Sequence, residues 1–201
     1  MNRLENWFCG SPLWRGFTRR HLLPWVLEGA DLGEHVLEVG AGFGAATEEL
    51  QRRTPRLTSL EYDAYSVEKL AARRQKARSG VVRGDAAALP FPEGTFSAVV
   101  AILVLHHLRS VAAQDRALAE IRRVLRPGGV FLAIEISDSW LGRVAHIRST
   151  FVPVAPAQVS ARLTAAGFFR ATVEFQRSAF RLRAVRAADT VFPVERAAST
   201  A

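Results

Sequence analysis

The sequence predicts an α/β fold: a doubly wound, mostly parallel seven-stranded sheet with an antiparallel last strand. From residue 35 onward, short apolar segments alternate with segments of helical periodicity, as repeated strand–helix units do. The apolar segment 36–39 leads directly into a glycine-rich stretch, G-A-G-F-G at 40–44, which is typical of a strand–turn–helix nucleotide site. Residues 96–103 form an almost unbroken apolar run, typical of a strand covered on both faces. Together these observations indicate a Rossmann-like sheet, in which ligands bind beyond the carboxyl ends of the strands.

Hydrophobic patterning and turn residues set the expected elements. Strands are expected at residues 35–39, 57–61, 80–83, 96–103, 130–136, 171–176 and 179–186. Helices are expected at residues 13–23, 44–53, 64–77, 111–125 and 156–166.

Proline and glycine mark where these elements end. Pro55 follows the helix at 44–53, because the residue before a proline avoids helical conformation. The stretch R-P-G-G at 126–129 ends the helix at 111–125 and turns the chain into a strand, and Gly167 is the expected end of the last helix. The connection between the last two strands is too short for a crossover, so these strands are antiparallel neighbours.

Length and composition describe a single-domain protein of ordinary globular character. The chain has 201 residues, and 49% hydrophobic content leaves enough apolar side chains for one core. Cys9 is the only cysteine, which excludes intrachain disulfides and cysteine-based zinc sites and suits a reducing cytoplasm. We expect no metal site, no secretory signal and no transmembrane segment, because the longest apolar run, 98–105, is too short to span a bilayer.

The net charge of +8 allows two interpretations. A strongly basic protein attracts nucleic acid, anionic lipid or an acidic substrate. The alternative is a general enrichment in arginine without a binding role. The arginines are spread along the chain and form no compact run, which favours the second interpretation.

The chain divides into three expected parts. Residues 1–30 contain three of the four tryptophans, and Pro12 and Pro24 break them into a start and one short helix. This aromatic and basic segment is expected to form a lid or a cover for the sheet. Residues 31–188 form the main domain, and the alanine-rich residues 189–201 are expected to form a flexible tail.

The acid before the glycine turn bears on which ligand binds there. The stretch 40–45 also fits G-x-G-x-x-A, the pattern of a dinucleotide-binding dehydrogenase. Glu38, however, lies where a dehydrogenase carries an apolar residue, because an anion there would repel the diphosphate. A carboxylate at this position favours a ligand with a cationic group, such as S-adenosylmethionine. The alternative role for Glu38 is to cap nearby backbone amides.

Two later segments add groups that suit a nucleoside. Glu61, at the end of the second strand, can accept both ribose hydroxyls, and Tyr62 can lie against an adenine or serve ordinary packing. Asp85 can accept the exocyclic amine of adenine, and the next backbone N–H, of Ala86, can reach a ring nitrogen. The alternative for Asp85 is an acid on a solvated loop.

Taken together and in order, the motifs resemble those of a known enzyme family. The set is V-L-E-V-G-A-G-F-G at 36–44, L-E-Y-D at 60–63, G-D-A-A-A-L-P-F at 84–91, L-H-H-L at 105–108 and L-R-P-G-G at 125–129. It resembles a class I S-adenosylmethionine-dependent methyltransferase of type 11, in the branch that includes the ubiquinone and menaquinone biosynthesis methyltransferases. The resemblance is strong over residues 35–136 and rests on topology over 156–186.

The resemblance implies roles for the matching positions. The methionine end of the cofactor would be held by the turn residues Gly40, Ala41, Gly42 and Gly44, and its ammonium by Glu38 through water. Glu61 would hold the ribose, Asp85 and Ala86 the adenine, and the backbone near Leu103 would close the site. The product would be S-adenosylhomocysteine. Ser97 departs from the pattern, where an aspartate is common, and this puts one local turn contact in doubt.

Residues for the methyl acceptor are less defined. His106 and His107 follow the fourth strand, and either could be a general base near neutral pH or could only shape the loop. The segment 137–155, which contains Trp140, Arg143, His146, Arg148 and Phe151, could join residues 1–30 in an aromatic, basic lid. Such a lid suits an apolar or anionic small molecule or lipid. The alternatives are a cover for the sheet edge and a peripheral membrane contact.

Other functions remain open at this stage. A nicotinamide-dependent oxidoreductase is disfavoured by Glu38, by Asp85 and by the lack of a Tyr-x-x-x-Lys pair. An RNA methyltransferase is disfavoured because residues 103–106 read L-V-L-H where such enzymes often carry N/D-P-P-Y/F. A cofactor-binding module without catalysis is the third alternative. We expect a cytoplasmic monomer or homodimer that does not bind nucleic acid.

Overall fold

One mixed sheet of seven strands forms the centre of the protein. The computed structural model describes residues 3–74, 79–138, 140–147 and 149–188. The strands lie in the order β3-β2-β1-β4-β5-β7-β6. Their bounds are β1 His35–Val39, β2 Arg56–Glu61, β3 Ser79–Arg83, β4 Phe96–Ile102, β5 Leu125–Ile136, β6 Phe168–Gln176 and β7 Ala179–Arg186. β7 pairs antiparallel with both β5 and β6, and all other neighbouring pairs are parallel, so the predicted topology, including the antiparallel last strand, is confirmed.

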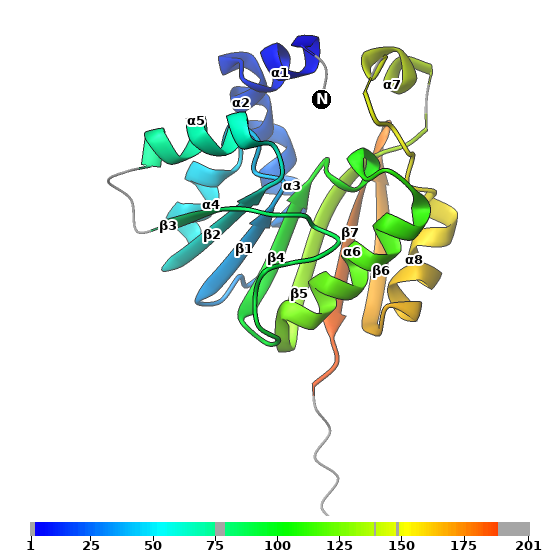
Figure 1. Ribbon diagram of the computed structural model, residues 1–201. Helices are drawn as coiled ribbons and strands as arrows, with labels where there is room; N and C mark the ends of the chain where they lie inside the picture. The colour runs from blue at the N-terminus through cyan, green and yellow to red at the C-terminus, as the bar shows by residue number, and fades with distance from the viewer. Residues whose placement is uncertain (1–2, 75–78, 139, 148, 189–201) are drawn as a thin grey trace, which may run out of the picture.

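Helices cover both faces of the sheet (Figure 1). Leu23 and Val26 of α3 and Leu50 of α4 belong to the hydrophobic cluster on one face, whereas α6 and α8 belong to the cluster on the other. The bounds are α1 Arg3–Cys9, α2 Pro12–Phe17, α3 Leu23–Val26, α4 Thr47–Arg53, α5 Ala64–Arg74, α6 Val111–Val124, α7 Trp140–Ala145 and α8 Pro156–Ala165. No helix in the described part of the chain is both long and apolar enough to cross a membrane.

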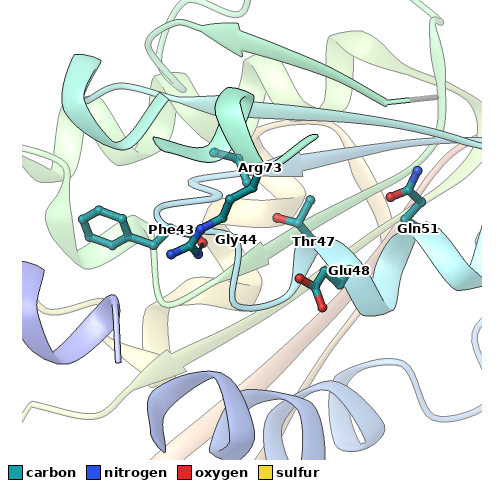
Figure 2. Close-up of a pocket in the computed structure, with 7 residues that line it drawn as sticks. Phe43, Gly44, Thr47, Glu48, Gln51 and Arg73 are labelled. Carbon is teal, nitrogen blue, oxygen red and sulfur yellow. Dashed lines mark hydrogen bonds between the residues drawn. The ribbon is translucent and has the colours of Figure 1, made fainter. Parts of the chain in front are cut away.

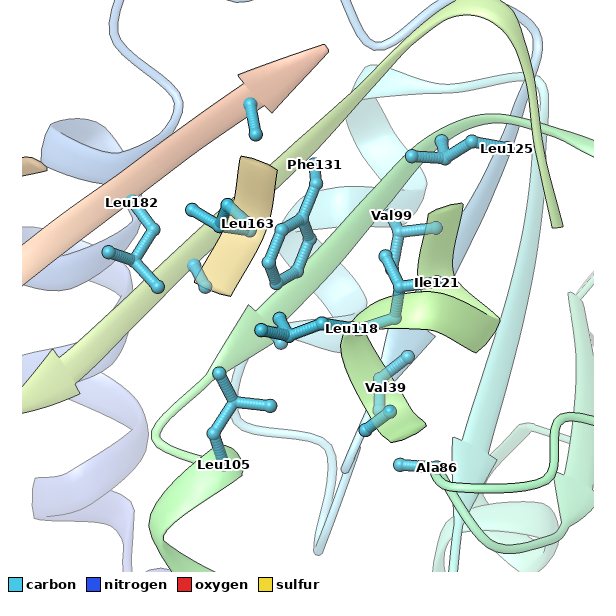
Figure 3. Packing of buried hydrophobic residues seen from close by; sticks show 14 of the residues in the cluster. Val39, Ala86, Val99, Leu105, Leu118, Ile121, Leu125, Phe131, Leu163 and Leu182 are labelled. Carbon is cyan, nitrogen blue, oxygen red and sulfur yellow. The ribbon is translucent and has the colours of Figure 1, made fainter. Parts of the chain in front are cut away.

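The strands divide their side chains between the two faces with a period of two. In β4, Ala98 and Val100 join the cluster beneath α3 and α4, and Val99 and Ala101 join the cluster beneath α6 and α8. Figure 3 shows the second cluster, in which Phe131 of β5 lies close to Leu118 of α6 and Leu163 of α8. Burial on both faces explains why the central strands read as continuous apolar runs.

The N-terminal helical path differs from the prediction of a single helix ended by Pro24. Helical backbone continues from α2 through a π-helical turn, η1 (Thr18–Leu22), into α3. The Leu23 N–H donates to the carbonyl of Thr18, five residues back, and Pro24 lies in the first turn of α3. A proline in the first turn of a helix removes no hydrogen bond, because the N–H groups there have no partner within the helix. Helical backbone therefore continues past Pro24.

Several predicted boundaries were wrong for local backbone reasons. α4 begins at Thr47 and not at Gly44, because Gly42 and Gly44 have φ values of +51° and +81°. β5 begins at Leu125, which pairs with Phe96, and the R-P-G-G stretch forms an irregularity before Val130 pairs with Ala98. β4 ends at Ile102, since the next residue has a positive φ.

The C-terminal half also contains differences. β6 begins at Phe168, with an irregularity before Thr172, where Arg170 has φ +52°. A short helix, α7, lies in the segment 137–155, where none was predicted. The predicted tail at 189–201, the end of the helix predicted at 64–77, and Arg148 lie outside the described residues.

A pair of charged residues on α6 anchors the loop that carries Asp85. The Leu89 N–H donates to Glu120 Oε2 at 2.8 Å, and the Arg123 guanidinium donates to the carbonyls of Phe91 and Leu89 at 2.8 and 3.0 Å. Glu120 and Arg123 also form an ion pair at 2.7 Å. Hydrogen bonding by Arg123 lowers the pKa of Glu120 below its usual range.

We expect Glu120→Ala to lower the free energy of unfolding by about 1–3 kcal/mol, because a charged acceptor of a backbone N–H is lost. The pKa of Glu120 is lower in the folded than in the unfolded protein, so the stabilisation is present above the unfolded-state pKa and is lost as the pH falls through the folded-state value. The difference between wild type and variant should therefore shrink below about pH 4 in urea titrations. Glu68→Ala, at an exposed position of α5, is the matched control. A Glu120→Ala protein as stable as this control at neutral pH would contradict the assignment.

Candidate cofactor and acceptor site

The glycine turn lies at the carboxyl end of β1 and is tied to β2. The N–H groups of Gly40 and Ala41 both donate to the carbonyl of Leu60, at 2.8 and 3.1 Å. A Cβ added at Gly40 would lie 2.4 Å from Val104 Cγ2, so the turn packs directly against the chain that follows β4. A Cβ added at Gly42 would meet no atom within 4 Å, so the backbone there faces open space. Gly40 is therefore required by packing, whereas Gly42 leaves room that a ligand can use.

Glu38 lies beneath this turn and is almost fully buried. Its Oε2 accepts hydrogen bonds from Thr47 Oγ1 of α4 and Ser59 Oγ of β2, both at 2.7 Å. A buried anion needs strong hydrogen-bond donors, and these two hydroxyl groups supply them. The carboxylate thus links β1 to β2 and α4. This placement is close to the predicted alternative of a structural carboxylate, with two hydroxyl groups among its partners.

Glu61 is brought to the glycine turn as predicted for a shared site. Its carboxylate accepts from the Gly42 N–H at 2.8 Å and from the Asp63 N–H at 2.9 Å. Its carbonyl accepts from the Gly84 N–H at 3.0 Å, which brings the loop after β3 beside it. Because each carboxylate oxygen has two lone pairs, Glu61 keeps capacity for further donors such as ribose hydroxyls.

The loop after β3 carries Asp85 on the surface and Ala86 in the interior. Asp85 Oδ1 accepts from the Ala87 N–H at 2.8 Å, which shapes the loop, and its side chain is exposed. Ala86 belongs to the buried cluster. Tyr62 is 59% exposed, so the position that was predicted to lie against adenine is open to solvent.

The turn after β4 is built around a fully buried acid, Glu135 of β5. Glu135 Oε1 accepts from the N–H groups of Val104 and Leu105 at 2.9 and 2.6 Å, and Oε2 lies 2.6 Å from His106 Nδ1. Leu103 has φ +57°, an uncommon value for a leucine, and its N–H donates to Ile134. Backbone strain of this kind is often found at functional sites.

Both histidines of this turn, in η2 (Leu105–His107), lie against His146. The ring centroids are 4.2 Å apart for His106 and His107, 5.1 Å for His106 and His146, and 5.2 Å for His107 and His146. Burial, together with the neighbouring His106 and His146, lowers the pKa of His107 to about 3. His106 is only 2% exposed. The structure thus gathers three imidazoles where the sequence analysis predicted two.

The N-terminal segment reaches this histidine cluster. Ser149 Oγ donates to Glu5 Oε1 of α1, and the same carboxylate oxygen lies 4.0 Å from His146 Nε2. In Figure 1, α1 and α7 lie beyond the edge of the sheet where β4 and β5 end. The predicted proximity of residues 1–30 and 137–155 is therefore present in the structure.

The glycine turn borders a small cavity through Phe43 and Gly44. A cavity of about 150 Å³ lies between α4 and α5, where Arg73 extends toward Phe43 and Gly44 (Figure 2). Its lining includes neither Glu61 nor Asp85, and its volume is below the 300–1,000 Å³ typical of small-molecule sites. The residues predicted to bind the nucleoside lie outside this cavity.

Comparison with known proteins agrees with this geometry. The family described as "Methyltransferase domain" matches residues 37–133, which span the glycine turn, Glu61, Asp85, the histidine turn and most of β5. The chain contains a class I S-adenosylmethionine-dependent methyltransferase domain. The cofactor implied by the family and the fold is S-adenosylmethionine.

The names of two relatives of this methyltransferase domain give different substrates. The chain is 41% identical over 108 residues to a demethylmenaquinone methyltransferase of Thermobifida fusca, which covers 52% of the chain and 44% of that protein. It is 38% identical over 102 residues to a fatty-acid O-methyltransferase of Mycolicibacterium smegmatis, covering 50% and 36%. The chain thus matches less than half the length of these two relatives.

A solved structure shares the fold of the methyltransferase domain at low identity. An S-adenosylmethionine-dependent methyltransferase from Mesorhizobium loti superposes with a TM-score of 0.67 at 15% identity, over 82% of this chain and 96% of the other. At this identity the likeness concerns the fold alone.

Sequence analysis missed the residues that hold the methyltransferase site together. Glu135 is the only acid in the apolar stretch 130–136, and a lone carboxylate in a strand expected to be buried was the available signal. Thr47 and Ser59, the partners of Glu38, gave no signal because hydroxyl residues are common near helix starts and in strands. The contact of Glu5 with Ser149 joins residues 144 positions apart and could not be read from the sequence.

We expect Gly42→Ala to leave the methyltransferase folded and to weaken S-adenosylhomocysteine binding by more than about tenfold. The positive φ of Gly42 lowers the free energy of unfolding by roughly 1–2 kcal/mol when a side chain is present. Binding is weakened separately, because the added methyl group enters the open space that the ligand would use. Gly40→Ala should instead lower the thermal midpoint strongly, because its Cβ would overlap Val104. Calorimetric titration and thermal unfolding distinguish the two outcomes. Undiminished binding by Gly42→Ala would contradict a ligand role for the turn.

Proposed function

We propose that this protein transfers the methyl group of S-adenosylmethionine to a small apolar molecule or a lipid. The observation that carries the proposal is the juxtaposition of Gly42 and Glu61. The Gly42 backbone faces open space while its N–H is held by a carboxylate that keeps capacity for ribose hydroxyls. The family match over the same residues supports a methyl-donor ligand there.

The proposed binding roles follow the placement of each residue. Gly40, Ala41, Gly42 and Gly44 shape the turn for the methionine end of the cofactor, and Glu61 accepts from the ribose. Asp85 accepts from the exocyclic amine of adenine and the Ala86 N–H donates to a ring nitrogen, with Tyr62 against the adenine ring. The backbone at Leu103 closes the site. Glu38 supports the turn from beneath through Thr47 and Ser59, so its action on the ammonium is indirect.

The chemistry asks little of the protein beyond alignment. Bound S-adenosylmethionine supplies a methyl group activated by a sulfonium. The acceptor atom forms its bond to the methyl carbon as the carbon–sulfur bond breaks and that electron pair goes to sulfur. The protein's part is to hold the acceptor in line, to exclude water and, for a protonated acceptor, to receive its proton. His106 and His107 stay our candidates for that last role.

The surface near the histidine turn favours an apolar acceptor. Trp7 and Phe8 of α1 and Trp140 of α7 are 71%, 46% and 71% exposed, and these helices lie beyond the carboxyl ends of β4 and β5 (Figure 1). Exposed aromatic side chains near a site suit an apolar ligand or a lipid surface. The names of relatives that act on a demethylated quinone and on fatty acids support the same class. A monomeric or dimeric state and a cytoplasmic location stay predictions.

We expect Glu61→Ala to weaken S-adenosylhomocysteine binding about 10- to 150-fold, because hydrogen bonds to a charged group contribute about 1.5–3 kcal/mol. Calorimetric titration measures this effect, and thermal unfolding reports any loss of the Gly42 contact. Glu34→Ala, at an exposed position before β1, is the matched control. Equal affinity in the Glu61→Ala and control proteins would refute the ribose assignment.

The acceptor class is tested with methyl-labelled S-adenosylmethionine and three pools: a lipid and quinone extract, a polar metabolite extract and total RNA. We expect label in the lipid and quinone pool, identified by mass spectrometry, and none in RNA. The same assay on His106→Ala and His107→Ala measures whether kcat depends on either histidine. Label in RNA alone, or NADH binding without S-adenosylhomocysteine binding, would overturn the proposed function.

A further inference from the structure

Three histidines from two separate segments meet beside the proposed transfer site. One potential ligand atom from each of His106, His107 and His146 lies within 4.8 Å of the others. The first two belong to η2, and the third follows α7. The proposed function uses His106 and His107 as candidates for a proton acceptor and gives His146 no role.

The hydrogen bonds of two imidazoles leave the same ring nitrogen available. His106 Nδ1 lies 2.6 Å from Glu135 Oε2, and His107 Nδ1 lies 3.3 Å from the Thr150 carbonyl. A carbonyl oxygen only accepts, and an ionised carboxylate does the same, so the neutral form of each ring carries its hydrogen on Nδ1. Each Nε2 then presents a lone pair. A ring N–H held by a carboxylate or a backbone carbonyl is the usual environment of a metal-binding histidine.

Further groups hold and balance the third histidine. Phe151 stacks on His146, with centroids 4.6 Å apart and planes at 24°. The Glu5 carboxylate lies 4.0 Å from His146 Nε2, so carboxylates of α1 and β5 border the cluster on two sides. Carboxylate groups beside three imidazole rings favour a cation bound among them.

We propose that His106, His107 and His146 form a binding site for a divalent transition-metal ion, with Zn²⁺ as the best match. Imidazole nitrogens bind Zn²⁺ at about 2.0–2.1 Å, which places the nitrogens of a tetrahedral site about 3.4 Å apart. The candidate ligand atoms lie within 4.8 Å of one another, so the rings must approach one another for all three to bind one ion. Three histidine ligands leave one coordination position for water or for an oxygen of another molecule.

The location suggests what such an ion does in the proposed methyl transfer. In the metal-bound protein His106 and His107 would be ligands in place of proton acceptors. An acceptor oxygen at the open position would then lose its proton to solvent more readily, because a bound cation lowers the pKa of a coordinated hydroxyl. The ion would also join the turn after β4 to the segment after α7. This role rests on the proposed function, whereas metal binding itself does not.

Metal binding is measured directly on the full-length protein after removal of any affinity tag and treatment with a chelator. We expect calorimetry to give one Zn²⁺ per chain, and Co²⁺ to produce visible absorption bands of tetrahedral character. His146→Ala should weaken Zn²⁺ binding at least tenfold, and the His107→Ala/His146→Ala protein at least 100-fold. His21→Ala, at an exposed position outside the cluster, is the matched control. Glu135→Gln, a positioning variant, should cost about 10- to 100-fold in affinity.

The outcomes separate the metal site from the methyltransferase function. Stoichiometric Zn²⁺ binding that His146→Ala and the double variant retain, or no binding by wild type, overturns the metal site. Circular dichroism and thermal unfolding establish that each variant is folded, and His146→Ala alone suffices if the His106 or His107 variants fail to fold. S-adenosylhomocysteine titration of the same samples reports on the proposed function independently, since Gly42 and Glu61 lie outside the cluster.

Discussion

The buried carboxylate of Glu135 fixes the geometry on which the rest of the site depends. An anion with no exposed surface must be paired, and it receives two backbone N–H groups and one imidazole from the turn after β4. That turn places Val104 against Gly40, where an added Cβ would lie 2.4 Å away. The position of the glycine turn is therefore linked, through Val104, to the acid on β5. The proposed cofactor and acceptor sides of the site therefore depend on the same carboxylate.

A second carboxylate has a comparable role on the other face of the sheet. Glu38 joins Thr47 and Ser59, so the start of α4 and the middle of β2 are held beneath the glycine turn. Glu61 then fastens the turn from above through the Gly42 N–H. Glu38 and Glu61, which the motifs assign to ligand binding, thus also hold the turn that we propose binds the ligand. Their substitution should therefore affect both affinity and stability.

The turn that carries His106 and His107 is the point at which the sheet meets the N-terminal segment and the segment after α7. α1 and the segment after α7 are far apart in the sequence, yet Glu5 contacts Ser149 and lies near His146. Exposed aromatic residues surround this junction on α1 and α7. The contacts of Glu5 with Ser149 and His146 therefore join two segments that lie outside the matched residues 37–133.

The order of strands and helices, the parallel sheet with its antiparallel last strand, and the Gly42–Glu61 neighbourhood all followed from the sequence. Each depends on local signals: apolar periodicity, glycine turns and short connections that allow one topology. The passage of helix through Pro24, the positive φ of Leu103 and the early start of β5 depended on tertiary contacts that override local preference. The same is true of the Glu135 network and the meeting of His146 with His106 and His107, because a side chain's partners across the fold leave no periodic trace in the sequence.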